Sequence, residues 1–136
     1  MKSYIPNNRE LRYFEQAAKE SYQSVHEKAM IDAVIVKGNY IAGRGYNKAK
    51  THPKQWRLDR MTGYFGQYGH IHAEVAALIN SGRIDLDGAE VFVYREDKKG
   101  NKANCKPCVS CARALKDAGV KHIYYTNSNG FVYEYR

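Results

Sequence analysis

Residues 71–82 have the sequence IHAEVAALINSG, which predicts a short helix. Its apolar residues recur at the spacing of one helical face, at Val75, Leu78 and Ile79. Gly82 is typical of the residue that ends a helix. His72 and Glu74 then fall in the first helical turn, so an imidazole and a carboxylate lie close together at the start of one element.

A second distinctive segment, PCVSC, follows at residues 107–111. Cys108 and Cys111 are three residues apart, which places both sulfurs on one face of a helical turn. Pro107 suits the start of a helix, and the pattern predicts that this helix runs over Cys108–Ala118. Two thiolates therefore also lie at a helix start.

One imidazole and two thiolates are a ligand set for zinc with one position left over. A structural zinc is closed by four protein ligands, whereas a catalytic zinc keeps three and leaves the fourth position to water or substrate. The ligand count of His72, Cys108 and Cys111 therefore favours a catalytic Zn²⁺.

In this order, H-x-E followed by P-C-x-x-C resembles the signature of the zinc-dependent cytidine/deoxycytidylate deaminase family. The resemblance implies that His72, Cys108 and Cys111 are the metal ligands and that Glu74 is the catalytic general acid/base. It implies hydrolytic deamination of a cytosine nucleotide, most plausibly dCMP to dUMP, in which zinc-bound hydroxide attacks the ring and ammonia leaves. It also implies the small-molecule nucleotide substrate of such enzymes and a homo-oligomer.

Two substrate contacts follow from the same resemblance. Asn47 matches the asparagine at a strand-loop junction that hydrogen-bonds the sugar hydroxyl in this family. Ala73 matches the position whose backbone lies against the base.

Further substrate contacts are expected from residue types alone. The basic stretch after Asn47 could bind a phosphate through Lys48, Lys50 and His52. In the predicted strand that contains Tyr125, alternation sends one ring of the Tyr124-Tyr125 pair outward, where it could cover a base.

Three alternatives remain open at this point. Basic loops with aromatic residues also suit a deaminase that acts on cytosine or adenine in single-stranded DNA or RNA. Cys105 could join His72, Cys108 and Cys111 in a closed Cys₃His site, which would make the protein a non-enzymatic binding module stabilised by structural zinc. His70 is a second candidate imidazole beside His72.

Composition bounds the setting of the protein. The 136 residues suit one domain, 1–136, and 22 Lys plus Arg against 14 Asp plus Glu favour anionic partners such as nucleotides or nucleic acid. No apolar run suggests a membrane span or a secretory signal. Three cysteines, two of them in a ligand motif, fit a reducing compartment, so a cytoplasmic location is expected.

The periodicity along the chain predicts an α/β fold. The expected helices are Asn8–Met30, Ile71–Ser81 and Cys108–Ala118, and the expected strands are Ile31–Val36, Tyr40–Gly45, Ala89–Tyr94, His122–Thr126 and Phe131–Tyr135. Tight turns are expected at Gly38-Asn39 and around residues 127–130, and Tyr46–Gly69 is expected to be a loop that lines the site. This order indicates a three-layer α-β-α sandwich with a mixed five-stranded sheet, the cytidine-deaminase-like core that the resemblance also implies.

Overall fold

The structure, a computed structural model, describes residues 2–21, 30–48, 50, 52–64, 70–97 and 99–136. Its strands form one sheet in the order β1-β6-β5-β4-β2-β3. The strands are β1 Lys2–Tyr4, β2 Met30–Lys37, β3 Tyr40–Tyr46, β4 Glu90–Glu96, β5 His122–Asn127 and β6 Gly130–Tyr135. The helices are α1 Asn8–Ser21, α2 Pro53–Thr62, α3 Ala73–Asn80 and α4 Val109–Ala118.

The sheet is mixed, as predicted. β4 and β5 are parallel, because α4 crosses over the sheet between them, and the other pairs are antiparallel. Both expected turns are present, with Gly38 in the left-handed region at φ 63°. The predicted count of five strands is wrong by one, because the three-residue β1 is too short to show a period of its own.

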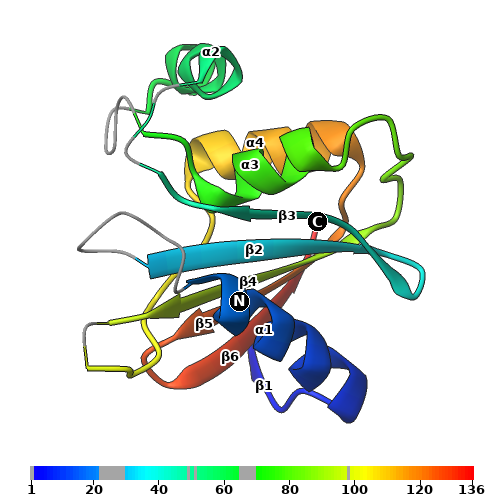
Figure 1. The fold of residues 1–136 in the computed structure, drawn as a ribbon, viewed down its shortest axis with the longest axis vertical. Coiled ribbons are helices and arrows are strands. Elements are labelled where there is room, and N and C mark those ends of the chain that lie inside the picture. The colour runs from blue at the N-terminus through cyan, green and yellow to red at the C-terminus, as the bar shows by residue number, and fades with distance from the viewer. Residues whose placement is uncertain (1, 22–29, 49, 51, 65–69, 98) are drawn as a thin grey trace.

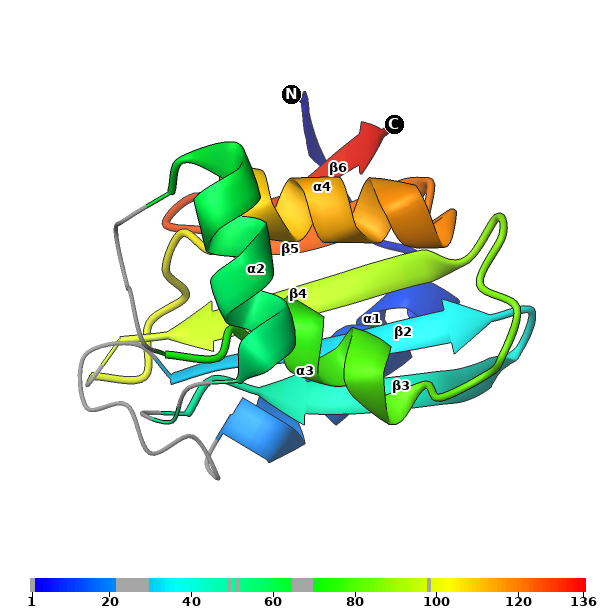
Figure 2. The same ribbon diagram turned by 90° about the horizontal axis from the view of Figure 1, so that it is seen from above.

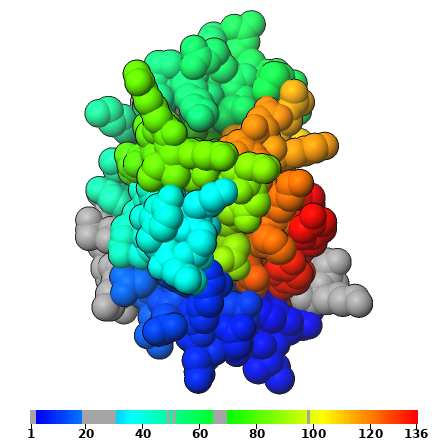
Figure 3. Space-filling view, turned by 90° about the vertical axis from the view of Figure 1, so that its right-hand side faces the viewer, coloured from blue at the N-terminus to red at the C-terminus, as the bar shows by residue number. Residues whose placement is uncertain are grey.

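Helices cover both faces of the sheet, which confirms the three-layer architecture (Figure 1). On one face, Phe14 and Ala17 of α1 are buried against Val34, Phe92 and Tyr124. On the other face, α3 and α4 bury a larger apolar core that includes Val75, Leu115 and Ile123. Figure 3 shows the two outer layers on one side of the molecule: the blue N-terminal residues lie at the bottom, and the green residues of α2 and α3 lie toward the top.

The stretch Tyr46–Gly69 is not simply the loop that was predicted, since it contains α2. Pro53 occupies the first turn of this helix, where its missing N–H costs nothing. The His52 side chain caps the helix start by accepting a hydrogen bond from the Lys54 N–H, and Gly63 ends the helix in the left-handed conformation at φ 70°. Pro53 and Gly63, which also occur in loops, here stand at the two ends of a helix. Residues 65–69 of the predicted loop lie outside the described residues.

The predicted helix Asn8–Met30 corresponds to α1 over Asn8–Ser21, and its last residue, Met30, belongs to β2 instead. The rest of the prediction, residues 22–29, lies outside the described residues. In the part of the chain that the structure describes, no helix is both long and apolar enough to cross a membrane.

Two glycines of β3 allow α3 to lie directly on the strand. A Cβ built on Gly43 would stand 2.4 Å from the Ala77 carbonyl oxygen, and one built on Gly45 would stand 2.5 Å from the Ala73 carbonyl oxygen. Both contacts are with helix backbone, which a side chain rotation cannot relieve. The close approach brings the start of α3, where His72 and Glu74 lie, against the end of β3.

We expect Gly45→Ala to lower the free energy of unfolding by about 3 kcal/mol or more, because the added methyl group would overpack the contact between β3 and the backbone of α3. Urea denaturation measures the change. Gly38→Ala is the control: its Cβ meets nothing within 4 Å, so it should cost only the left-handed backbone strain of about 1–2 kcal/mol. Equal stability of Gly45→Ala and the unsubstituted protein would show that α3 does not need this approach.

Candidate metal centre and active site

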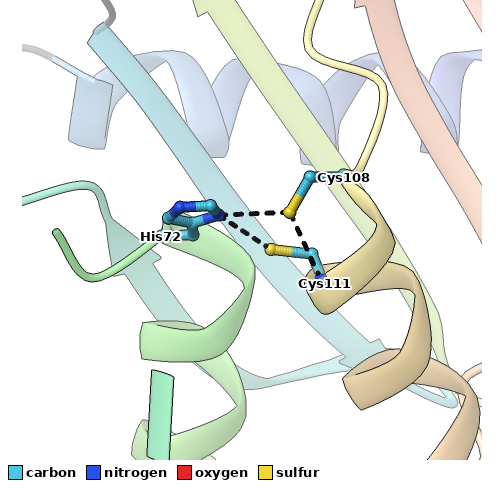
Figure 4. Close-up of side chains that lie close together, drawn as sticks. All are labelled: His72, Cys108 and Cys111. Atoms are coloured by element: carbon cyan, nitrogen blue, oxygen red, sulfur yellow. Dashed lines mark hydrogen bonds between the residues drawn. The ribbon is translucent and has the colours of Figure 1, made fainter. Parts of the chain in front are cut away.

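Two helix starts converge at one end of the sheet and bring three predicted ligands together (Figure 4). His72 is the N-cap of α3, and Cys108 is the N-cap of α4. The His72 Nδ1 atom lies 3.3 Å from Cys111 Sγ and 3.4 Å from Cys108 Sγ. The three ligand atoms all lie within 4.8 Å of one another, so one metal ion could contact all of them.

The chemistry of this donor set fits zinc. Hydrogen bonding from Cys111, together with His72, lowers the pKa of Cys108 to about 4, so this sulfur is a thiolate at neutral pH. The bond to Cys108 and burial raise the pKa of Cys111 well above its ordinary value. The Cys111 proton would be released as a metal takes its place, which is the usual coupling between thiol deprotonation and zinc binding.

Cys105 does not join this group. Its thiol is buried and donates to the Val93 carbonyl oxygen at 3.3 Å, with Thr126 Oγ1 also at 3.3 Å. Burial raises the pKa of Cys105 to about 12, so it remains a thiol. Among the described residues the cluster that could hold a metal consists of His72, Cys108 and Cys111 without His70, so the closed Cys₃His alternative has no support here.

Glu74 lies beside the ligands in the same small cavity. Burial raises the pKa of Glu74 to about 6, although the neighbouring His72 charge lowers it in part. The cavity has a volume of about 150 Å³. Its walls are formed by Ile31, Asn47, Tyr64, His72, Ala73, Glu74, Arg95, Asn104, Cys105, Lys106 and Cys108. A carboxyl group that can hold or release a proton near neutral pH therefore faces the space next to the donor set.

Asn47 and Ala73, predicted to contact substrate, both line this cavity. Asn47 is buried just after β3, where its Oδ1 accepts a hydrogen bond from the Ile31 N–H at 3.1 Å. The bridge between Lys48 and Ile71 then carries the chain past the start of α3. Asn47 thus lines the same cavity as Ala73 and Glu74 of α3.

Four other predicted contacts are not brought to the cavity. The Lys48 ammonium lies 4.8 Å from the centroid of the Tyr46 ring. Lys50 is exposed and does not line the cavity, and His52 is the N-cap of α2. Tyr125 is 1% exposed in the core, and its hydroxyl donates to Glu134 at 2.6 Å. The inward member of the tyrosine pair thus packs under the helices, and the geometry gives it no access to a base.

The structure adds cavity residues that the sequence prediction missed. Arg95 lines it from the end of β4 and Lys106 from the segment that precedes α4, and the Arg95 guanidinium donates to the Asn104 carbonyl oxygen at 2.9 Å. The Tyr64 ring stands edge-on to His72 with ring centroids 5.6 Å apart. The sequence pointed to these cations only in that residues 95–106, predicted to be a loop, are basic.

Known proteins are similar to this chain in sequence. A family model for the cytidine and deoxycytidylate deaminase zinc-binding region matches residues 7–127. The deoxycytidylate deaminase of Mycobacterium phage D29 is 28% identical over 123 residues, which cover 80% of this chain and 87% of the phage protein.

Solved structures share the fold. The apo dCMP deaminase of cyanophage S-TIM5 matches with a TM-score of 0.62 and 23% identity, covering 90% of this chain and 86% of that one. Its complex with dCMP and dUMP matches with a TM-score of 0.60 and 21% identity, covering 90% and 83%. A guanine deaminase from Bacillus subtilis matches with a TM-score of 0.54 and 20% identity, covering 90% and 65%. The predicted cytidine-deaminase-like fold is therefore confirmed.

Proposed function

Because the chain belongs to the cytidine and deoxycytidylate deaminase zinc-binding family, we propose that it is a hydrolytic deaminase that converts dCMP and water to dUMP and ammonia. One observation carries the proposal: the buried Glu74 carboxyl shares a cavity with His72 and Cys108, next to a donor set of three ligands. The named relative, a deoxycytidylate deaminase, supports the choice of substrate.

His72, Cys108 and Cys111 would hold the zinc ion. When bound, Zn²⁺ lowers the pKa of a coordinated water to near ~7 and so supplies a nucleophile at neutral pH. With a raised pKa of about 6, Glu74 can accept the first proton that the water loses and deliver it to the ring nitrogen. It can then accept the second proton, from the hydroxyl now attached to the ring carbon, and deliver it to the departing amine as the carbon–nitrogen bond breaks. Both protons of the water thus end in the products, and Glu74 ends the cycle as it began.

The other cavity residues would hold the nucleotide in place. Asn47 is fixed by its bond to Ile31 and would bind the sugar hydroxyl. Ala73 would let the base approach the backbone of α3, since its side chain is only a methyl group. Arg95 and Lys106 are the cations of the described cavity lining and would bind the phosphate, in place of the residues expected from sequence.

We expect Lys106→Met to raise the KM for dCMP about 10-fold, because a hydrogen bond from a charged group contributes about 1.5–3 kcal/mol. The KM for deoxycytidine, which has no phosphate, should not change. Steady-state kinetics with both substrates give the comparison. Lys99→Met is the matched control, since Lys99 lies in the same loop but not on the cavity. Parallel losses for both substrates would place Lys106 in folding or general binding instead.

A substrate panel tests the proposed reaction directly. Zinc-loaded protein should release ammonia from dCMP at a higher kcat/KM than from deoxycytidine, CMP or cytidine. A single-stranded oligonucleotide that contains cytosine and adenine completes the panel. Deamination of the oligonucleotide alone, or of none of these compounds, would overturn the proposal. Sedimentation of the same sample tests the predicted homo-oligomer.

A further inference from the structure

A buried polar network joins α2 to the two ligand-bearing helices. Its centre is Asp59, whose side chain is 1% exposed and whose Oδ1 accepts two hydrogen bonds. One comes from Gln55 Nε2 at 2.9 Å and the other from the Ser110 hydroxyl at 2.7 Å. Gln55 and Ser110 are equally inaccessible, at 2% and 0%. Three polar side chains are thus buried together outside the cavity that holds Glu74.

Each end of this network reaches a metal ligand. Gln55 Oε1 accepts a hydrogen bond from the backbone N–H of His72 at 3.0 Å. Ser110 lies between Cys108 and Cys111 in the first turn of α4. Figure 2 shows α2 lying across α3 and α4, which is the placement that lets one helix reach both starts. The path from His72 to the cysteines therefore runs through two side chains of α2 and one of α4.

The chemistry of the groups sets the direction of every bond. The Asp59 carboxylate can only accept, so the Gln55 amide must turn its NH₂ group toward Asp59. Its carbonyl oxygen then faces His72 N–H, one of the donors that a helix start leaves without an intrahelical partner. The Ser110 hydroxyl must likewise give its proton to Asp59. A single carboxylate therefore orients both groups that contact the ligand segments.

We propose that Gln55, Asp59 and Ser110 are positioning residues that hold His72 at the separation from Cys108 and Cys111 that zinc requires. Through Gln55 and Asp59, α2 bonds to the start of α3 and the start of α4 at once. The role rests on the zinc site and is independent of which substrate the enzyme deaminates. It assigns to α2 a task that the family motif residues do not carry.

Zinc affinity of the purified protein, without substrate, tests this role. Ser110→Ala and Gln55→Leu should each weaken zinc binding about 10–100-fold, the range typical of groups that support metal ligands. Competition with a chromophoric chelator measures the affinity, and the visible spectrum of the Co²⁺ form reports the ligand geometry. Asp59→Ala should act like these variants, whereas Asp59→Asn, which keeps one acceptor oxygen, should recover much of the affinity.

Ser81→Ala is the matched control for these substitutions. Ser81 is also buried, and its hydroxyl donates to the Ala77 carbonyl oxygen at the far end of α3. It should lower the free energy of unfolding without changing zinc affinity. The proposal is overturned if the network variants keep the affinity and Co²⁺ spectrum of the unsubstituted protein, or if Ser81→Ala weakens zinc binding equally. Because no substrate is present, this failure is distinct from failure of the proposed reaction.

Discussion

Glu74→Gln should lower kcat for dCMP deamination by about 10²–10⁴-fold, the usual contribution of a general acid/base. We expect the upper part of this range, because the same carboxyl serves the water, the ring nitrogen and the departing amine. The amide has nearly the same size but cannot take up or give the proton. Zinc content and dCMP binding should therefore stay close to those of the unsubstituted protein.

Ammonia release under single-turnover conditions measures the chemical step, and metal analysis of the same sample measures zinc. Glu15→Gln makes the same chemical change at an exposed position of α1 and should leave kcat unchanged. A Glu74→Gln protein that retains full activity would remove Glu74 from the mechanism. Loss of zinc together with activity would show instead that the carboxylate supports the metal site.

Cys108→Ala should remove bound zinc and reduce activity to background. The loss should exceed the ~10–100-fold effects of residues that only support ligands, because a metal–sulfur bond itself is removed. A second effect adds to it: the Cys108 sulfur also accepts a bond from the Cys111 N–H at 3.4 Å, which caps α4. Metal analysis after dialysis and the substrate panel provide the two readouts.

Cys105→Ala is the matched control, since it removes a thiol three residues away in the same segment. Cys105 donates to Val93 and lies outside the ligand cluster, so this variant should keep its zinc. Zinc loss from both variants would favour a closed site with three thiolates. Retention of zinc by Cys108→Ala would show that the ligand set is different.

The ligand set could be read from sequence because local spacing determines it. Cys108 and Cys111 stand on one turn of one helix, and His72 and Glu74 stand at the start of another, so each pair keeps its geometry wherever the helices pack. The helices and long strands were predicted for the same reason, since their burial repeats with the period of the element. β1 and α2 escaped the prediction: one is only three residues long, and the other was hidden behind Pro53 and Gly63, which also punctuate loops.

The contacts of the cavity wall could not be read in this way. Tyr125 and the basic residues after Asn47 had suitable chemistry for substrate binding, but whether a side chain reaches the cavity depends on how the strands and loops cross. Packing buried Tyr125 under α3 and α4, and it brought Arg95 from the end of β4 and Lys106 from the segment before α4 to the same cavity. Asp59, four residues before Gly63, lay in the predicted loop, and residue spacing gave no sign that its side chain would be buried against Ser110 of α4.

By itself the sequence predicted the cluster of His72, Cys108 and Cys111 and the Glu74 carboxyl group beside it, because these side chains lie within single helical turns whose geometry is local. It also determined the layered fold, since alternating periods of 2 and 3.6 residues leave few ways to bury the apolar faces. Only the tertiary structure decided that Cys105 stays outside the ligand group, which cations line the cavity, and that α2 bonds to both helix starts. Those outcomes depend on distances between segments far apart in the chain, which close packing determines and residue spacing does not.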